Sequence, residues 1–464
     1  MNKLIESLQQ IVGPNASVTE PDLLQPHLTE WRDRVRGKTP ILLLPDSTAK
    51  VAAIVRACAA AGTSIVPQGG NTGMCAGAVP DGSGTQVIVN LARMNQIRSV
   101  DPTDFSLVAE AGCILADVQT AASAVGCYFP LSLGGEGSCQ IGGNLATNAG
   151  GINVLRYGTA RDLALGLEVV LADGRVWDGL KTLRKDTAGY DLKQLFIGSE
   201  GTLGIITTVA VKLFPPPGAL TTALVAVPTA SDAVALLAEL RALLPERIEA
   251  YELIAKRAIE FVLRHIPGTR LPFDEAYPWY VLMDIASGGD SQHLEVALAK
   301  AHTDGQIIDA VIAKNATEAE QLWRMRHSIS EAEKREGRGI KHDISVPVGR
   351  MAEFLQEAET RLAQLCPQAI PVIFGHVGDG NLHYNALLSN AVPEADLGRL
   401  AEDVTRVIYE LVTTMRGSIS AEHGIGVLKK SALETYSSPV ALDMMRALKV
   451  ALDPDCILNP GKVF

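Results

Sequence analysis

The chain has 464 residues, of which 47% are hydrophobic and 20% are charged. This length predicts two or three domains with substantial hydrophobic cores, and the composition lies far from that of disordered proteins. The formal net charge is −11 at pH 7 and no run of basic residues is present, which argues against a nucleic-acid-binding protein.

The cysteines and the N-terminus bear on the compartment. Seven cysteines are widely spaced and form no C-x-x-C pair, which is typical of free thiols in a reducing compartment. The N-terminus places Glu6 where a signal peptide would be apolar, and no uninterrupted apolar run reaches membrane-spanning length. We therefore expect a cytoplasmic protein without a transmembrane segment, although peripheral membrane docking stays open.

The first 217 residues predict strands that run into glycine-rich loops. After a short helix and loop in residues 1–30, residues 41–45 predict a strand, followed by a helix that Asp46 or Ser47 caps and Gly62 ends. Residues 64–67 predict the next strand, which leads into a Gln-Gly-Gly-Asn-Thr-Gly loop. Successive backbone N–H groups in such a loop can converge on a pyrophosphate. A plain turn is the alternative, and the G-x-G-x-x-G fingerprint of Rossmann sites is absent.

Further glycine-rich loops are expected at residues 130–138, 141–151 and 197–206. The segment 141–151 is too rich in small residues to pack as ordinary core, so we expect another group to press closely on its backbone. The Pro-Pro-Pro-Gly run that follows Phe214 is typical of a domain boundary.

The rest of the chain predicts a second α+β domain and a turn-rich tail. A strand from Thr221 precedes helices at 231–244 and 251–264, a strand at 280–284, and helices at 316–335, 349–364 and 394–415. The tail from Leu452 is expected to fold back on the first domain.

Histidines cluster in a predicted hairpin between the last two helices. Residues 371–374 and 382–388 predict two strands joined by a tight Gly-Asp-Gly-Asn turn. This hairpin would bring His376 and His383 side by side, and neutral imidazoles so placed are good ligands for zinc or a similar divalent metal. Further along, Glu422 and His423 offer a carboxylate and a third imidazole. A lone histidine is more often structural, but the cluster favours a site.

Taken together, these motifs resemble a known family. The glycine-rich segments and Asn459-Pro460-Gly461-Lys462 resemble the vanillyl-alcohol-oxidase (PCMH-type) FAD family, and the histidine hairpin with Glu422-His423-Gly424 resembles its D-2-hydroxyacid dehydrogenase branch, especially the 2-hydroxyglutarate dehydrogenases. The resemblance covers nearly the whole chain. It implies an α+β fold with a PCMH-type FAD-binding domain at 1–217, a substrate or cap domain carrying the metal site at 218–438, and a C-terminal segment at 439–464 that packs on the FAD domain.

The resemblance implies which residues hold the cofactor. Residues 69–73 would hold the pyrophosphate, and Asn71 stands where several relatives attach the flavin covalently through histidine, so we expect non-covalent FAD. The full set of expected FAD-binding residues is Pro67, Gln68, Gly69, Gly70, Asn71, Thr72, Gly73, Gly134, Gly137, Ser138, Gly142, Asn144, Thr147, Asn148, Gly151, Glu200, Gly204, Ile205 and Asn459.

The resemblance also implies the chemistry. His376, His383 and Glu422 would bind a divalent metal, most simply zinc, which coordinates the 2-hydroxyl and C1 carboxylate of the substrate. His423 would take the hydroxyl proton as the C2 hydride leaves for flavin N5. Asn385 would donate a hydrogen bond to the C1 carboxylate.

Three residues are expected to set the length of the substrate. Arg326 and Ser330, at i and i+4 of a predicted helix, would share a face, and Lys341 follows the next turn. In 2-hydroxyglutarate dehydrogenases the matching residues grip the distal carboxylate, with threonine where this chain has Ser330. The alternative is that Arg326 and Lys341 are solvated charges.

The expected activity is therefore oxidation of D-2-hydroxyglutarate to 2-oxoglutarate. D-lactate or D-malate dehydrogenase is one alternative, and a flavin-binding subunit of a larger oxidation complex is another. The family implies an electron-transfer flavoprotein or a quinone as electron acceptor, and a homodimer is the default assembly.

Overall fold

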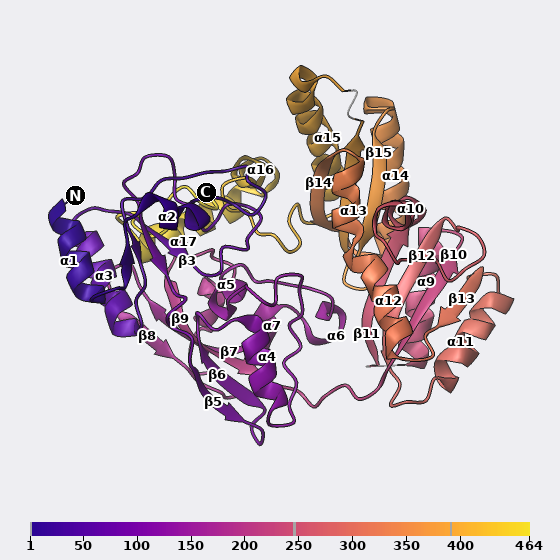
Figure 1. The fold of residues 1–464 in the computed structure, drawn as a ribbon, viewed down its shortest axis with the longest axis horizontal. Coiled ribbons are helices and arrows are strands. Elements are labelled where there is room, and N and C mark those ends of the chain that lie inside the picture. The colour runs from indigo at the N-terminus through magenta and orange to yellow at the C-terminus, as the bar shows by residue number, and fades with distance from the viewer. Residues whose placement is uncertain (1, 245–246, 390–391) are drawn as a thin grey trace. The chain divides into compact units, whose positions relative to one another are not determined.

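The chain divides into two compact units in a computed structural model that describes residues 2–244, 247–389 and 392–464 (Figure 1). Unit 1 comprises Met1–Gly150, Tyr157–Pro216 and Glu422–Phe464, and unit 2 comprises Gly151–Arg156 and Pro217–Ala421. The sequence placed the two boundaries at 217/218 and 438/439. In the structure the chain returns to unit 1 at Glu422, whereas the sequence predicted this return at residue 439.

Unit 1 contains two sheets. The first has the order β1-β2-β4-β3, in which β2 and β3 each pair with β4 in parallel, and the second is an antiparallel sheet of order β5-β6-β9-β7-β8. The strands are β1 Ser17–Val18, β2 Leu42–Leu43, β3 Ile65–Gln68, β4 Val87–Asn90, β5 Ile97–Asp101, β6 Ser106–Glu110, β7 Ala164–Val170, β8 Val176–Gly179 and β9 Ile205–Lys212.

Both sheets of unit 1 contribute to one hydrophobic core. It joins Val89 of the first sheet to Leu107 and Val209 of the second, and Leu458 of the tail, which bridges Ile65 in parallel, belongs to the same core. The helices around it are α1 Asn2–Val12, α2 Pro21–Leu28, α3 Thr48–Ala60, α4 Leu115–Ser123, α5 Ile141–Ala146, α7 Ala160–Leu163, α8 Lys193–Phe196, α16 Lys430–Tyr436 and α17 Pro439–Leu452, while α6 Val154–Tyr157 spans a boundary of the units.

Unit 2 is built on one seven-stranded antiparallel sheet of order β13-β10-β12-β11-β15-β16-β14. Strand β11 lies at its centre and is buried along its whole length. The strands are β10 Leu220–Val227, β11 Ile248–Ala255, β12 Trp279–Ala286, β13 Asp309–Ile312, β14 Arg338–Ser345, β15 Ile370–Gly375 and β16 Asn381–Leu388.

Helices cover both faces of this sheet. Successive side chains of β11 point to opposite faces and contact different helices. The Tyr251 hydroxyl donates to the Ala233 carbonyl of α9, whereas Ile254 packs in a cluster with Met325 and Ile329. The face toward Tyr251 carries α9 Ala230–Leu243, α11 Gln292–Thr303, α14 Met351–Leu365 and α15 Glu394–Thr414. The 3-10 turn Val348–Arg350 precedes α14. The opposite face carries α10 Lys256–His265, α12 Ala316–His327 and α13 Ile329–Glu336.

Several predicted elements differ in the structure. Residues 251–255, predicted as the start of a helix, complete β11, because a buried apolar run of this kind fits either period. The helix predicted at 316–335 breaks at Ser328, which ends α12 and begins α13. Residues 141–146, expected as loop, form the short helix α5, in which a Cβ on Gly142 would lie 2.5 Å from the Cβ of Ala111. The predicted close approach to this segment is therefore made by Ala111.

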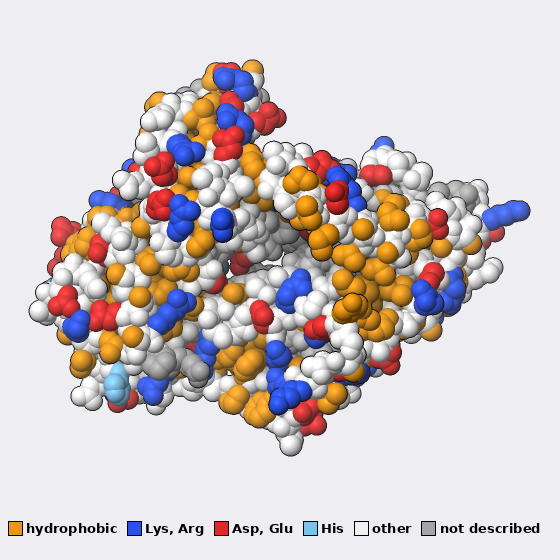
Figure 2. Space-filling view, turned by 180° about the vertical axis from the view of Figure 1, so that it is seen from behind, with side chains coloured by type: hydrophobic (Ala, Val, Ile, Leu, Met, Phe, Trp, Pro, Cys, Tyr) orange, Lys and Arg blue, Asp and Glu red, His pale blue; other side chains and the backbone are white. Residues whose placement is uncertain are grey.

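The surface is mixed in charge. Figure 2 shows acidic and basic side chains interspersed over one face. Among the described residues, no helix has both the length and the apolar character that a membrane span requires.

The thiols differ in accessibility. Six of the seven cysteines are buried and Cys456 is exposed, and burial raises the pKa of Cys58 and of Cys113 to about 12. We expect iodoacetamide to label one thiol rapidly in the native protein, at Cys456, as located by peptide mass spectrometry. Cys456→Ser should abolish the rapid phase. Rapid labelling of a second cysteine in the native chain would contradict the assignment.

Asp284 of β12 ties α12 to the sheet, because its carboxylate accepts hydrogen bonds from Thr222 Oγ1 at 2.5 Å and Trp323 Nε1 at 2.9 Å. Burial raises the pKa of Asp284 above its ordinary value of 3.8. The folded chain thus binds this proton more tightly than the unfolded chain, and the resulting stability is full at low pH and is lost as pH rises through the folded-state pKa.

Asp284→Asn cannot ionise, so the Tm of the variant minus that of wild type should increase as the pH is raised from about 4 to about 7. Thermal unfolding across this range checks the trend, with Asp290→Asn, at an exposed site of the same unit, as control. A Tm difference between wild type and Asp284→Asn that does not change with pH would show that the buried charge has no such cost.

Candidate active site

A glycine-rich loop at the end of β3 forms an anion-binding cradle in unit 1. The backbone N–H groups of residues 70–73 donate to no acceptor in the part of the chain that the structure describes. A Cβ on Gly70 would lie 2.1 Å from the Ser138 carbonyl oxygen, so only glycine fits there. Consecutive free N–H groups of this kind suit a pyrophosphate.

Asn71 has a positive φ of 53°, and its side-chain amide acts as a hydrogen-bond donor. Its Nδ2 donates to the carbonyls of Pro26 and Thr29, both at 3.0 Å. The side chain therefore holds the loop against the C-terminal end of α2.

The loop lines a pocket whose empty volume, including the part open to solvent, is about 950 Å³. Residue His423 also lines it. The expected FAD-binding residues that line the pocket are Pro67, Gln68, Gly69, Gly70, Asn71, Thr72, Gly73, Gly142, Asn144, Thr147, Glu200, Gly204 and Ile205.

Other expected residues stand behind the lining. Ser138 packs its carbonyl against Gly70, and the Asn148 side chain accepts a hydrogen bond from the Arg161 N–H at 2.9 Å. Asn459 Nδ2 donates to the carbonyls of Gly77 at 2.9 Å and Glu200 at 2.7 Å. Asn459 thus joins two loops that line the pocket. Gly134 and Gly137 do not line it, and Gly151 belongs to unit 2.

Two buried acceptors test whether the pocket fits a flavin. Gln140 Oε1 and Asn144 Oδ1 are buried without a hydrogen-bond partner among the described residues, and both side chains line the pocket. With the free N–H groups of residues 70–73, they give the pocket unused acceptors as well as donors, as a flavin dinucleotide requires. Gln140 was missed in the sequence because it precedes the small-residue motif; the other lining residues missed are Cys75, Gly77, Ala78, Leu91, Ala111, Cys139, Gly143, Ala146, Gly201 and Ile206.

Glu200 fixes the loop that carries His423. Its carboxylate accepts hydrogen bonds from the backbone N–H groups of Ile425 at 2.7 Å and Gly426 at 2.8 Å. Burial raises the pKa of Glu200, although both donors oppose the change. The role of its carboxylate is therefore to position a backbone segment.

In unit 2, strand register places the other candidate residues on one face of the sheet. His383 lies opposite Asp343 and Phe374, and Asn385 lies opposite Lys341 and Val372. Cross-strand partners point to the same face. The predicted hairpin is confirmed, and it sets the rings of His376 and His383 side by side, with centroids 5.9 Å apart.

Two buried glutamates that sequence reasoning missed hold the cationic residues of this face. Glu252, with no exposed surface, accepts from Arg326 Nε at 2.6 Å and contacts His376 Nδ1. Glu333, 1% exposed, accepts from Lys341 Nζ at 2.9 Å and Asn385 Nδ2 at 3.0 Å. Burial alone would raise the pKa of Glu252, but Arg326 and His376 outweigh it and hold that pKa well below the usual range.

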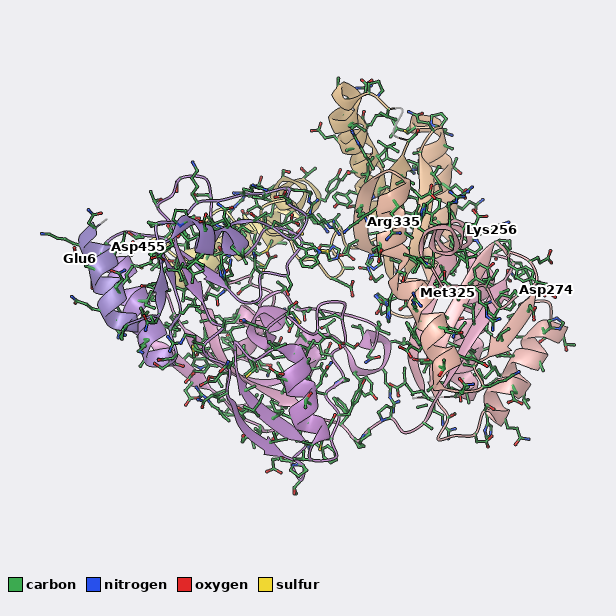
Figure 3. All side chains as sticks on the ribbon, viewed as in Figure 1. Glu6, Lys256, Asp274, Met325, Arg335 and Asp455 are labelled. Atoms are coloured by element: carbon green, nitrogen blue, oxygen red, sulfur yellow. The ribbon has the colours of Figure 1, made fainter. Side chains whose placement is uncertain are left out.

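Arg326 is thus buried and paired, which excludes a fully solvated charge. It follows Met325 on α12, which Figure 3 labels. The expectation that Arg326 and Ser330 share a helix face is wrong, because the helix breaks at Ser328 and Ser330 is exposed.

Glu422 follows the last residue of unit 2. The N–H of Ala421 donates to the carbonyl of Asp343 at 3.3 Å, so the chain leaves unit 2 beside the strand position that faces His383. The next two residues are Glu422 and His423.

The glycine cradle generates a direct test. We expect Gly70→Ala to lose most of its bound flavin, because the added methyl would displace the Ser138 backbone. The flavin-to-protein absorbance ratio after purification measures this. Gly82→Ala is the control, because a Cβ at Gly82 meets nothing within 4 Å and Gly82 does not line the pocket. Full flavin content in Gly70→Ala would contradict the cradle.

Comparisons with known proteins agree with this arrangement. Residues 39–179 match an FAD binding domain, and residues 216–463 match the C-terminal domain of FAD linked oxidases. The chain is 41% identical over 463 residues to the mitochondrial D-2-hydroxyglutarate dehydrogenase of Bos taurus, covering 99% of this chain and 83% of the relative. It is 39% identical over 463 residues to the D-2-hydroxyglutarate dehydrogenase of Xanthomonas citri pv. viticola, covering 99% and 96%.

Solved structures show the fold. Substrate-bound p-cresol methylhydroxylase matches with a TM-score of 0.77 at 16% identity, covering 100% of this chain and 96% of that chain. Alkyldihydroxyacetonephosphate synthase matches with a TM-score of 0.74 at 18% identity, covering 99% and 86%. The predicted α+β fold with a PCMH-type FAD-binding domain is confirmed. The chain belongs to the FAD-linked oxidase family, as a relative of the D-2-hydroxyglutarate dehydrogenases over nearly its whole length, and it is an FAD-dependent oxidoreductase.

Proposed function

We propose that this chain oxidises D-2-hydroxyglutarate to 2-oxoglutarate. The observation that carries the proposal is that one sheet face presents His376 and His383 together with the cations Arg326 and Lys341. Such a face offers ligands for the hydroxyacid end of a diacid and donors for its second carboxylate. The names of the relatives in cattle and Xanthomonas support the same substrate.

The flavin would be held by the pocket of unit 1. The N–H groups of residues 70–73 would bind the pyrophosphate, and Gln140 and Asn144 offer unpaired acceptors to the donors of the dinucleotide. Bound FAD supplies the acceptor for the hydride from C2 of the substrate. Because Asn71 is not nucleophilic and already donates to two carbonyls, we propose that FAD is bound non-covalently.

The residues His376, His383 and Glu422 would hold a divalent metal, most simply zinc. The contact of His376 Nδ1 with a carboxylate is the usual outer-shell arrangement of a metal-binding histidine, which leaves Nε2 to face the ion. Glu422 directly follows Ala421, which is anchored to Asp343. Such an ion would act as a Lewis acid toward the 2-hydroxyl oxygen of the substrate.

His423 would act as the general base. The oxidation removes a proton from the 2-hydroxyl and a hydride from C2, leaving a carbonyl, and the imidazole of His423 would accept that proton. His423 lines the flavin pocket, and Glu200 fixes the backbone just after it. Since Ala421 is bound to unit 2, the covalent chain holds His423 within about 7 Å of that anchor whatever the arrangement of the units.

Arg326 and Lys341 would grip the distal carboxylate. Arg326 uses Nε for Glu252, and its two terminal nitrogens stay available as a fork for a second carboxylate. Glu333 holds Lys341 and uses one of the two amide hydrogens of Asn385, so the other can reach the C1 carboxylate. The hydroxyl of Ser330, which is exposed, stays a predicted ligand of the distal carboxylate.

The test is bleaching of the flavin absorbance under anaerobic conditions by D-2-hydroxyglutarate and by D-lactate. We expect fast bleaching by the diacid, abolished by a chelator and restored by zinc. Arg326→Lys keeps the charge beside Glu252 but loses the planar fork, so diacid reduction should slow by about 10- to 100-fold, the value of one or two charge-assisted hydrogen bonds.

The matched control is Arg324→Lys on the same helix, where the arginine is exposed and donates to the Pro267 carbonyl. It should leave bleaching unchanged. Equal bleaching by D-lactate, or an Arg326→Lys variant as fast as wild type, would overturn the assignment of a diacid.

Turnover by the purified chain with an artificial electron acceptor separates this enzyme from a flavin-binding subunit that needs a larger complex. The physiological acceptor, an electron-transfer flavoprotein or a quinone, stays a prediction, as do a homodimer and a cytoplasmic location.

A further inference from the structure

One buried carboxylate contacts two residues of the proposed site at once. Glu252 lies on the central strand β11, where it has no exposed surface. Leu253 pairs with Gly375 and Ile254 with Phe374, and the next residues beyond these pairs, Glu252 and His376, contact each other through their side chains. An ionisable side chain in the middle of a seven-stranded sheet is costly unless both of its oxygens are used.

The contact with His376 fixes the imidazole. An ionised carboxylate only accepts hydrogen bonds, so His376 Nδ1 must carry a hydrogen toward Glu252 Oε1. In the neutral ring this leaves Nε2 as the acceptor atom, the one that can bind a cation. The ring orientation and the tautomer are therefore set from inside the sheet.

The contact with Arg326 fixes the guanidinium. Glu252 Oε2 accepts from Arg326 Nε at 2.6 Å, and the guanidinium lies over the Phe374 ring at 4.8 Å from its centroid. These two contacts hold the plane of the group and leave its two terminal nitrogens for a ligand. The arginine can then meet an incoming carboxylate without reorienting.

The carboxylate of Glu252 also allows metal binding at His376 and carboxylate binding at Arg326 to occur side by side. A divalent ion on His376 and the cation of Arg326 would repel each other across a poorly solvated sheet face. A negative charge bonded to both groups offsets that repulsion. Glu333 performs no such double task, because its partners Lys341 and Asn385 are not proposed metal ligands.

We propose that Glu252 is a positioning residue that sets metal affinity and preference for a diacid together, through His376 and Arg326. This inference rests on the function proposed above. It separates Glu252 from a purely structural ion pair, which would change the stability of the sheet but neither property of the site.

The decisive variant is Glu252→Gln, compared with wild type as flavin-loaded protein. Zinc affinity, measured by competition with a chromophoric chelator, should fall about 10- to 100-fold. The ratio of kcat/KM for D-2-hydroxyglutarate to that for D-lactate should fall in the same variant. Glu249→Gln is the matched control, because Glu249 is also buried on β11 and pairs with Arg156. Its zinc affinity should equal that of wild type.

A measurement on the wild type needs no variant and covers the case in which Glu252→Gln does not fold. Long-range proton–nitrogen correlation spectra of the metal-free protein should show His376 with its hydrogen on Nδ1. A neutral His376 ring with its hydrogen on Nε2 and none on Nδ1 would overturn the proposal.

The remaining outcomes are distinguishable. A folded Glu252→Gln with wild-type zinc affinity and an unchanged substrate ratio, even at a lower Tm, would overturn the positioning role alone. A wild type that binds no zinc and does not reduce its flavin with the diacid would overturn the proposed function and this inference with it.

Discussion

The register of the antiparallel sheet in unit 2 is the constraint on which the proposed chemistry depends. The side chains of β14, β16, β15 and β11 that share a face are fixed by cross-strand pairing, and a slip of one residue would send all of them to the opposite face. The close approach of β15 to β16 requires glycine at position 375, because a Cβ there would lie 2.6 Å from the Asn381 carbonyl oxygen. The pairing of β15 with β16 also brings the rings of His376 and His383 together.

Placing cations on that face requires compensation inside the sheet. Arg326 and Lys341 each have a buried glutamate as partner, so the four side chains carry no net charge. The protein thereby keeps two charged donors in a poorly solvated region without stranding either, which would cost several kcal/mol. Each donor still has hydrogens left for a ligand, since one guanidinium nitrogen and one ammonium hydrogen suffice for its glutamate.

Local patterns predicted the parts of the site that lie in turns and glycine-rich loops. The segment after β3 and the hairpin at 371–388 carry strong signals, because glycine there meets a steric demand, as at Gly70 and Gly375. Glu252 and Glu333 had no such signal. Both lie among residues that predict a helix. The contacts of Glu252 follow from the pairing of strands distant in sequence, and those of Glu333 from the packing of α13 beside the sheet. The same limit applies to β11, whose apolar run fits either period, and to the break at Ser328, which no proline or glycine marks.

Asn459, which is synthesised late, holds together two loops of the flavin pocket that are synthesised early. Its amide joins the carbonyls of Gly77 and Glu200, and its neighbour Leu458 bridges Ile65, so residues 458–459 tie together a pocket whose lining, apart from His423, lies more than 250 positions earlier. A nascent chain on the ribosome can fold much of unit 1 before it has this tie, as N-terminal segments generally fold first. A translation product that stops short of Asn459 would lack this tie between two loops that line the flavin pocket.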